Sequence, residues 1–272
     1  LIGGFLTQHF GWRSIFSSVG IVISLISILL LWKLRGEKVT VKAPPFDYTG
    51  SVILGITLLT LIWGLSELPD IQGIISLVIS IAALFLFIRR ESRVPYPLLD
   101  INLFKNNTVF AFSNLAALIN YCATFSVAFL LSLYLQYIKG FSPEYAGLIM
   151  VTQPAFQAIV SPVAGRLSDR LEPRILSSLG MGLTTAGLII LIFLNDRTPL
   201  AMIIVSLIVL GIGFGIFSSP NTNAIMSSVD HKLYSFASAI TSTSRTVGQM
   251  LSLGIVTFLF SLIIGRQQIT EE

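Results

Sequence analysis

The sequence has little charge and almost no cysteine or histidine. Only 11% of its 272 residues are Asp, Glu, Lys or Arg, compared with about 25% in an ordinary soluble domain. The single cysteine, Cys122, excludes a disulfide within the chain. Neither His9 nor His231 has a cysteine or carboxylate partner at metal-ligand spacing, and no Ser-His-Asp or paired-carboxylate pattern is present. We therefore expect no soluble fold, no metal site, no cofactor and no catalytic residues.

Long apolar runs dominate instead. Apolar residues make up 54% of the chain, and eight charge-poor runs approach the roughly 20 residues that an α-helix needs to cross a bilayer. A soluble protein would bury one such helix at most. We expect an all-α polytopic membrane protein with about eight transmembrane helices, placed in the lipid bilayer of the cell membrane. The predicted spans are residues 14–34, 48–65, 71–88, 107–137, 145–164, 175–194, 200–220 and 234–264.

Lys and Arg are unevenly divided between alternate connections of these spans. One set of connections holds twelve of them and the other set holds four. Because cytoplasmic loops carry the excess of Lys and Arg, the richer set predicts the cytoplasmic side. Their position at span ends argues against a nucleic-acid partner, despite the net charge of +4. The richer set is Lys33, Arg35, Lys38, Lys42, Arg89, Arg90, Arg93, Lys105, Arg166, Arg170, Arg174 and Lys232, and the other is Arg13, Lys139, Arg197 and Arg266.

A short charged loop, residues 165–174, joins two spans on the predicted cytoplasmic side. Gly165 permits a sharp turn where two helices meet. Asp169 stands among Arg166, Arg170 and Arg174, close to the N-terminus of the next helix, where the helix dipole favours negative charge. Such a cluster is suited to lock one conformation and to release in another. The alternative is that the arginines only follow the positive-inside rule and Asp169 balances them.

The last predicted span carries a polar stripe. At about 100° per residue, its polar side chains fall within about 40° of one helical face. Burying an arginine against lipid is costly, so this face must contact protein or water, and an intramembrane charge is a functional candidate. We predict that Arg245, Gln249 and Thr241 line a transport cavity, and the alternative is that Arg245 pairs with a helix-end carbonyl in packing. The stripe consists of Ser238, Thr241, Ser242, Arg245, Gln249 and Ser252.

Gln153, Gln157 and Ser161 form a second stripe on the fifth span, next to Pro154 and Pro162. Proline frees a backbone carbonyl and allows a helix to bend where neighbours or water satisfy that carbonyl. This pattern predicts a cavity wall with hinges, lined by Gln153 and Gln157. Hydrogen bonds that join two helices are the alternative.

Asparagines also occur in two of the C-terminal spans. Asn114 and Asn120 are about 120° apart on a helix, so at most one of them faces a cavity, and we take Asn114 as the candidate. Asn221 and Asn223 lie near the predicted cytoplasmic end of their span. At that position an asparagine more often caps the end of a helix.

The charged loop, Gly165-x-Leu167-Ser168-Asp169-Arg170 with Arg174, resembles the cytoplasmic signature loop of the major facilitator superfamily, in its C-terminal-half copy. Further motifs match the fourteen-span drug–proton antiporter branch of that family, in the same order. Glu172 and Pro173 depart from the pattern, which usually has Gly and a basic residue there. The further motifs are Gly3-Gly4 with Trp12-Arg13-x-Ile15-Phe16, Ala146-Gly147-Leu148, Gln153-Pro154, Ser161-Pro162, and Phe236-Ala237-Ser238 with Arg245 and Gly248.

This resemblance implies a place in the fold for each segment. Residues 1–36 would end an N-terminal helix bundle, residues 37–106 would hold two extra linker spans with cytoplasmic connectors, and residues 107–272 would form a C-terminal bundle that lacks its final span. The chain is then expected to be a fragment with the sixth to thirteenth spans. The loop residues Gly165, Arg166, Asp169, Arg170 and Arg174 are implied to act in gating.

The resemblance also implies export of small molecules, such as drugs or other amphipathic compounds, by proton antiport and alternating access. All thirteen Asp and Glu residues lie in loops, tails or span ends. We therefore hypothesise that the proton-coupling carboxylate precedes Leu1. The residues also leave open a non-transporting receptor or assembly scaffold built on the same helices. An enzyme within the membrane is disfavoured, because clustered acids, histidines or cysteines are missing from the sequence.

Overall fold

The structure, a computed structural model, describes residues 2–33, 47–95, 97–99 and 101–263. The regular elements of these residues are helices. They form eight segments that are long and apolar enough to cross a membrane, and some of these segments consist of two successive helical elements. The predicted all-α fold and the span count are therefore confirmed. The polar stretch of residues 35–46 and the tail with Arg266 lie outside the described residues. The spans are α2 (Arg13–Lys33), α3 (Tyr48–Ser66), α4 (Ile71–Glu91), α6 (Thr108–Leu133), α7 with α8 (Pro143–Met150 and Thr152–Ser168), α9 (Pro173–Ile192), α10 (Leu200–Ser227) and α11 (Tyr234–Ile263).

Short elements complete the chain between and before these spans. Helix α1 (Ile2–Phe10) precedes α2, and α5 (Ile101–Asn106) lies inside the basic connector that leads to α6. The last turn of the α6 span, Tyr134–Ile138, widens into a π-helix, and Lys139 donates its backbone N–H to the Tyr134 carbonyl at 3.0 Å. A 3₁₀ turn, His231–Leu233, leads into α11.

Side chains at the helix ends explain why several helices begin where they do. Asn107 accepts a hydrogen bond from the Phe110 N–H at 2.9 Å and caps α6, and Asp47 does the same for α3 through Gly50. Pro154 has no N–H to donate to the Met150 carbonyl, so the fifth span is broken at Val151 into α7 and α8.

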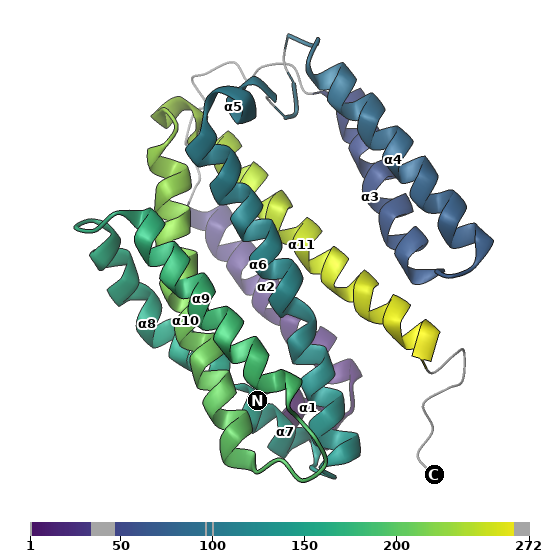
Figure 1. Ribbon diagram of the computed structural model, residues 1–272, viewed down its shortest axis with the longest axis vertical. Coiled ribbons are helices and arrows are strands. Elements are labelled where there is room, and N and C mark those ends of the chain that lie inside the picture. The colour runs from purple at the N-terminus through teal and green to yellow at the C-terminus, as the bar shows by residue number, and fades with distance from the viewer. Residues whose placement is uncertain (1, 34–46, 96, 100, 264–272) are drawn as a thin grey trace.

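The C-terminal helices pack as two groups that meet where α6 contacts α10. Helix α10 packs against both α8 and α9, and α6 packs along α11. Helices α3 and α4 form an antiparallel pair beside the bundle (Figure 1). This pair contacts α11 where Gly254 faces Leu65, since a methyl group on Gly254 would lie 2.6 Å from the Leu65 Cδ1 atom.

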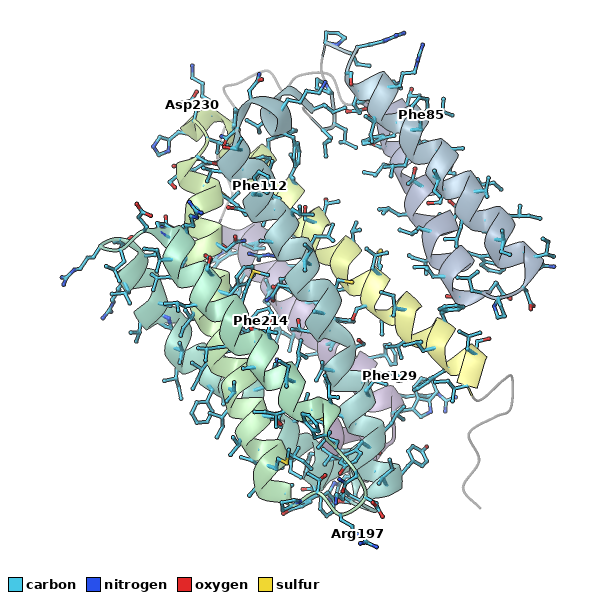
Figure 2. All side chains as sticks on the ribbon, viewed as in Figure 1. Phe85, Phe112, Phe129, Arg197, Phe214 and Asp230 are labelled. Atoms are coloured by element: carbon cyan, nitrogen blue, oxygen red, sulfur yellow. The ribbon has the colours of Figure 1, made fainter. Side chains whose placement is uncertain are left out.

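Two apolar clusters close the ends of the C-terminal bundle. One contains Leu131, Ile149 and Leu207, and the other contains Phe110 and Ile225. Asp230 and Arg197 lie in turns at opposite ends of the molecule, as Figure 2 shows, in agreement with the predicted alternation of the connections. Buried polar side chains of α6, α10 and α11, among them Asn114, Asn221 and Thr241, lie inside the same bundle, and Asn114 and Thr241 belong to the predicted site.

Candidate functional site

The charged loop is shorter in the structure than in the sequence prediction. Helix α8 continues through Gly165 and Arg166 to Ser168, and α9 begins at Pro173 with Glu172 as its N-cap residue. The two residues that depart from the family pattern therefore start a helix, because proline is favoured in the first turn. Only the turn with Asp169 and Arg170 separates the two helices.

The charged side chains of this loop point outward. Arg166, Asp169, Arg170 and Arg174 are all exposed. Among the described residues, ion pairs occur only between Arg90 and the carboxylates of Asp47 and Glu91, so none of the four loop charges is paired in this part of the chain. The loop charges are thus open to a partner that these residues do not supply.

Uncharged residues anchor the loop on α10. Ser168 is buried, and its hydroxyl donates a hydrogen bond to the Gly165 carbonyl at 2.7 Å. The same hydroxyl accepts a bond from Asn223 Nδ2 at 3.0 Å. Gly165 lies against Ser219, because a Cβ atom added to it would meet the Ser219 Oγ atom at 2.8 Å.

Arg245 is half-buried between α6, α10 and α11. Its Nη2 atom donates a hydrogen bond to Thr222 Oγ1 at 2.7 Å, and its guanidinium lies 5.7 Å from the centre of the Tyr121 ring, within the range of a cation–π contact. The Tyr121 ring meets Phe214, labelled in Figure 2, edge to face at 5.2 Å between ring centroids. The buried Nε atom has no acceptor among the described residues. The guanidinium therefore keeps donors that protein atoms described here do not satisfy.

Some side chains of the polar stripe of α11 are buried in contacts with other protein atoms, and others are exposed. Thr241 is buried and donates its hydroxyl to the Ala237 carbonyl, while Ser252 and Ser126 share a hydrogen bond of 2.8 Å. Gly248 faces α6 so closely that a Cβ atom would lie 2.4 Å from the Leu118 carbonyl oxygen. Ser238 and Ser242 are exposed, and Gln249 is half-buried. Packing against α6 thus accounts for much of the stripe, and the cavity-lining role of Arg245, Gln249 and Thr241 stays a prediction.

The stripe on α8 also faces a neighbouring helix with its backbone. Gly211 and Gly215 of α10 lie against it, and a Cβ atom on Gly211 would sit 2.4 Å from the carbonyl oxygen of Gln153. The side chains of Gln153 and Gln157 are half-buried. Small residues on α10 therefore let its backbone approach α8, and the predicted cavity-lining role of the two glutamines stays a prediction.

The asparagines behave differently from the helix-end caps expected for two of them. Helix α10 runs seven residues beyond Pro220, so Asn221 and Asn223 lie inside it and donate to other helices, Asn221 to the Ser113 carbonyl at 3.1 Å. This corrects the capping interpretation. Asn114 is 2% exposed and donates to the Phe110 carbonyl at 2.9 Å, and its Oδ1 atom has no donor among the described residues. Its placement in a transport cavity stays a prediction.

A cavity of about 700 Å³ lies between α6, α9 and α10, at the loop end of the bundle. Of the predicted site residues, Arg174 contributes to its lining, and the predicted cavity-lining residues do not. Ser177, whose buried hydroxyl has no partner among the described residues, also lines it, together with Asn221. Sequence reasoning missed Ser177, because two adjacent serines near the start of a span do not form a stripe along one helical face.

A second polar cluster, also missed, joins α3 and α4 to the connector before α6. Arg90 forms ion pairs with both Asp47 and Glu91, and Glu91, 2% exposed, accepts a hydrogen bond from the Leu99 N–H at 2.8 Å. The hydrogen bond from Arg90, followed by that from the Gly50 N–H, lowers the pKa of Asp47 from 3.8 to about 2. Within the described ranges, no three His, Cys, Asp or Glu side chains gather in a way that would hold a metal ion.

Comparison with curated proteins finds relatives along almost the whole chain. A riboflavin transporter, RibZ of Clostridioides difficile, is 30% identical over 270 residues, which are 98% of this chain and 57% of the relative. The multidrug resistance protein Stp of Mycobacterium tuberculosis is 28% identical over 94% of this chain and 48% of its own length. The multidrug efflux pump LfrA of Mycolicibacterium smegmatis is 29% identical over 96% and 52%. The chain spans about half the length of the curated relatives it matches.

Comparison with protein families gives a single assignment for nearly the same region. Residues 1–253 match the Major Facilitator Superfamily, and this match includes the signature loop, Arg245 and all spans except the end of α11. The eight apolar helices of the described residues agree with a multi-pass membrane protein. The chain therefore belongs to the major facilitator superfamily, a family of membrane transporters and not of enzymes.

Proposed function

We propose that the chain is part of a fourteen-span exporter that moves small amphipathic molecules out of the cell, across the plasma membrane, by proton antiport. Two relatives named as multidrug resistance and efflux proteins support this proposal, because the similarity to them extends along more than nine-tenths of the chain. A relative named as a riboflavin transporter leaves the choice of small molecule open. Alternating access would come from rocking of the two helix bundles around a central site.

The packing of the helices supports a division into three segments. Residues 1–36 would end the N-terminal bundle, residues 37–106 would be the inserted linker pair, and residues 107–272 would be the C-terminal bundle. Helices α3 and α4 pack closely on each other, with Gly64 against Leu77, and stand beside α11 in Figure 1. Such a pair can be inserted between two bundles without entering the core of either one.

The observation that carries the proposal is the half-buried guanidinium of Arg245. A charge within a span is costly, is usually paired, and commonly marks a substrate or ion pathway. Thr222 satisfies one of its donors, and the described carboxylates lie outside ion-pair distance. We assign the free donors to an acceptor on the substrate or on a span outside this chain, and we assign the exposed charges of the signature loop to gating contacts with that other half.

Proton coupling needs a carboxylate that the described spans do not place near Arg245. Glu91 is buried, but it lies at the end of α4 and is paired with Arg90. We therefore place the coupling carboxylate in a span that precedes Leu1 in the complete transporter. If neutralising each acid in those spans leaves the proton dependence of efflux unchanged, this placement is wrong.

The test is drug efflux by the complete transporter in membrane vesicles, with and without a proton gradient. The proposal expects efflux of amphipathic dyes that stops when the gradient is collapsed. Arg245→Ala should lower the efflux rate roughly tenfold or more, because a hydrogen bond to a charged group contributes about 1.5–3 kcal/mol. Arg245→Lys should keep part of the activity, since it keeps the charge but not the planar set of donors.

The matched control is Arg197→Ala, which removes an exposed arginine in the turn before α10. It should leave efflux unchanged at equal expression. Wild-type efflux in both Arg245 variants would remove Arg245 from the site. Unchanged efflux combined with loss of a bound partner protein would favour the receptor or scaffold interpretation.

A further inference from the structure

Three consecutive residues of α10 reach three different helices. Asn221 donates to Ser113 of α6, Thr222 accepts from Arg245 of α11, and Asn223 donates to Ser168 of α8. Successive residues on a helix project about 100° apart, so one turn is enough to face three neighbours. Residues 221–223 form one turn of α10. Within this turn, the residue that contacts the half-buried Arg245 is directly followed by the residue that contacts the signature loop at Ser168.

The contact of Thr222 with Arg245 and that of Asn223 with Ser168 are built in the same way. The Thr222 hydroxyl donates to the Ser218 carbonyl at 2.8 Å and accepts from Arg245. The Ser168 hydroxyl donates to the Gly165 carbonyl at 2.7 Å and accepts from Asn223. In each pair the hydroxyl proton is held by the hydroxyl's own helix, so a lone pair is directed at the donor from the neighbouring helix. Both contacts are therefore oriented, which non-specific packing would not require.

Pro220 precedes this turn and separates it from the rest of α10. Proline removes the hydrogen bond to the Ile216 carbonyl, so the helix is weakest just before residue 221. The Pro220 side chain is less than 2% exposed, which holds that point in the bundle core. The last turns of α10 are thus able to shift as a unit against the rest of the helix.

We propose that Thr222 and Asn223 form a polar relay that positions the signature loop relative to Arg245, so that movement of the loop during transport moves the arginine. Thr222 and Asn223 are positioning residues in this scheme and need not touch the substrate. The proposal rests on the proposed transport function for its consequence. The structural part of the proposal, namely that the loop and Arg245 move together, can be tested without any substrate.

Cys122 provides a native reporter for that coupling. It is half-buried on α6 next to Tyr121, the ring that Arg245 covers, and its backbone N lies 3.1 Å from the position a Gly248 Cβ would take. A shift of Arg245 or α11 against α6 changes the exposure of its thiol. The experiment measures the labelling rate of Cys122 by a small maleimide in the complete transporter, with any other cysteines replaced.

The relay predicts a specific pattern of rates. Asn223→Ala and Ser168→Ala should each speed labelling of Cys122 about threefold, the effect of losing one inter-helix hydrogen bond in a membrane protein, and the double variant should be no faster. In a Thr222→Val background, Asn223→Ala should have no further effect. Thr222→Ser, which keeps the hydroxyl, and the exchange variant Asn223→Ser with Ser168→Asn should both restore the wild-type rate.

Thr243→Val is the matched control, because Thr243 is a half-buried threonine of α11 whose hydroxyl donates to the Ala239 carbonyl of its own helix and bonds to no other helix in the described part of the chain. It should label at the wild-type rate. In efflux assays the relay variants should lower the maximal rate about threefold with little change in the half-saturating concentration.

Two results would overturn the relay. The first is that Asn223→Ala labels Cys122 and exports dye at the wild-type rates. The second is that the double variant with Asn223→Ala and Thr222→Val changes the labelling rate of Cys122 by the product of the two single changes. If the complete transporter exports none of the tested dyes, the proposed function fails, while the labelling rates still decide the relay.

Discussion

At the scale of single residues, small side chains decide how closely the helices of the C-terminal bundle approach. Gly180 of α9 faces the backbone of α10, and an added Cβ atom would lie 2.5 Å from the Phe217 nitrogen. Gly182, two residues further on, faces open space. The two glycines look alike in the sequence, yet only Gly180 forms a close contact. Such close approach is the usual way in which membrane helices gain packing contacts.

These two positions make a matched pair of substitutions. Gly180→Ala should lower the thermal stability of the solubilised transporter, by about 1–3 kcal/mol, because the methyl group would overlap backbone atoms that cannot move aside easily. Gly182→Ala should be neutral or stabilising by up to about 1 kcal/mol, because alanine favours the helix. Unfolding followed by tryptophan fluorescence gives the comparison. Equal effects of the two substitutions would contradict the packing described for α9 and α10.

At the scale of elements, the linker pair is held at its ends. Leu65 of α3 packs on Gly254 of α11 at one end, and the cluster of Asp47, Arg90 and Glu91 lies at the other. Glu91 also accepts the Leu99 N–H from the connector to α6. This cluster therefore ties the linker helices to the chain that enters the C-terminal bundle, and we expect the pair to move with that bundle.

Asp47 gives this element a predicted dependence on pH. Its pKa is lowered from 3.8 to about 2 in the folded protein, so its contribution to stability is complete above pH 3.8 and disappears as pH falls through about 2. Asp47→Asn should therefore melt at a lower temperature than the wild type near neutral pH. The difference should shrink as pH falls from 3.8 towards 2.

Thermal unfolding of both proteins over that pH range is the measurement. Asp196→Asn, in the exposed turn before α10, is the control and should match the wild type throughout. A difference between Asp47→Asn and the wild type that is as large near pH 2 as at neutral pH would contradict the assigned ion pair.

At the scale of the whole molecule, the connections before and after α10 lie at opposite ends of the bundle (Figure 2). Asp230 and Arg197 lie at opposite ends in Figure 2. The Lys and Arg distribution predicts that the Asp230 end faces the cytoplasm. We expect a cysteine at position 230 to react with a membrane-impermeant maleimide only in inverted vesicles, and a cysteine at position 197 only in intact cells. Labelling of both positions from the same side would refute the predicted topology.

The candidate site was only partly predictable from the sequence, because its contacts join residues that are far apart in the chain. The residue types and spacing predicted a role for the intramembrane Arg245 and a charged loop over residues 165–174, of which only the turn between Ser168 and Pro173 is not helical. They did not indicate that the turn is anchored by Asn223, because Ser168 and Asn223 are 55 residues apart in the chain. The sequence also predicts helix-end caps at Asn221 and Asn223, because the apolar run ends near Pro220. The helix continues to Ser227, so both residues lie inside it.

The apolar runs alone predict an all-α membrane protein with eight spans, and the predicted boundaries lie within about four residues of the helix ends except in α10, which continues seven residues past Pro220. These properties depend on local quantities, namely the length of an apolar run and the residues at its ends. Only the tertiary structure decided which face of α11 packs on α6, and that Thr222 and Asn223 connect Arg245 to the signature loop. Those contacts depend on how four helices rotate and tilt against one another, and no single span carries that information.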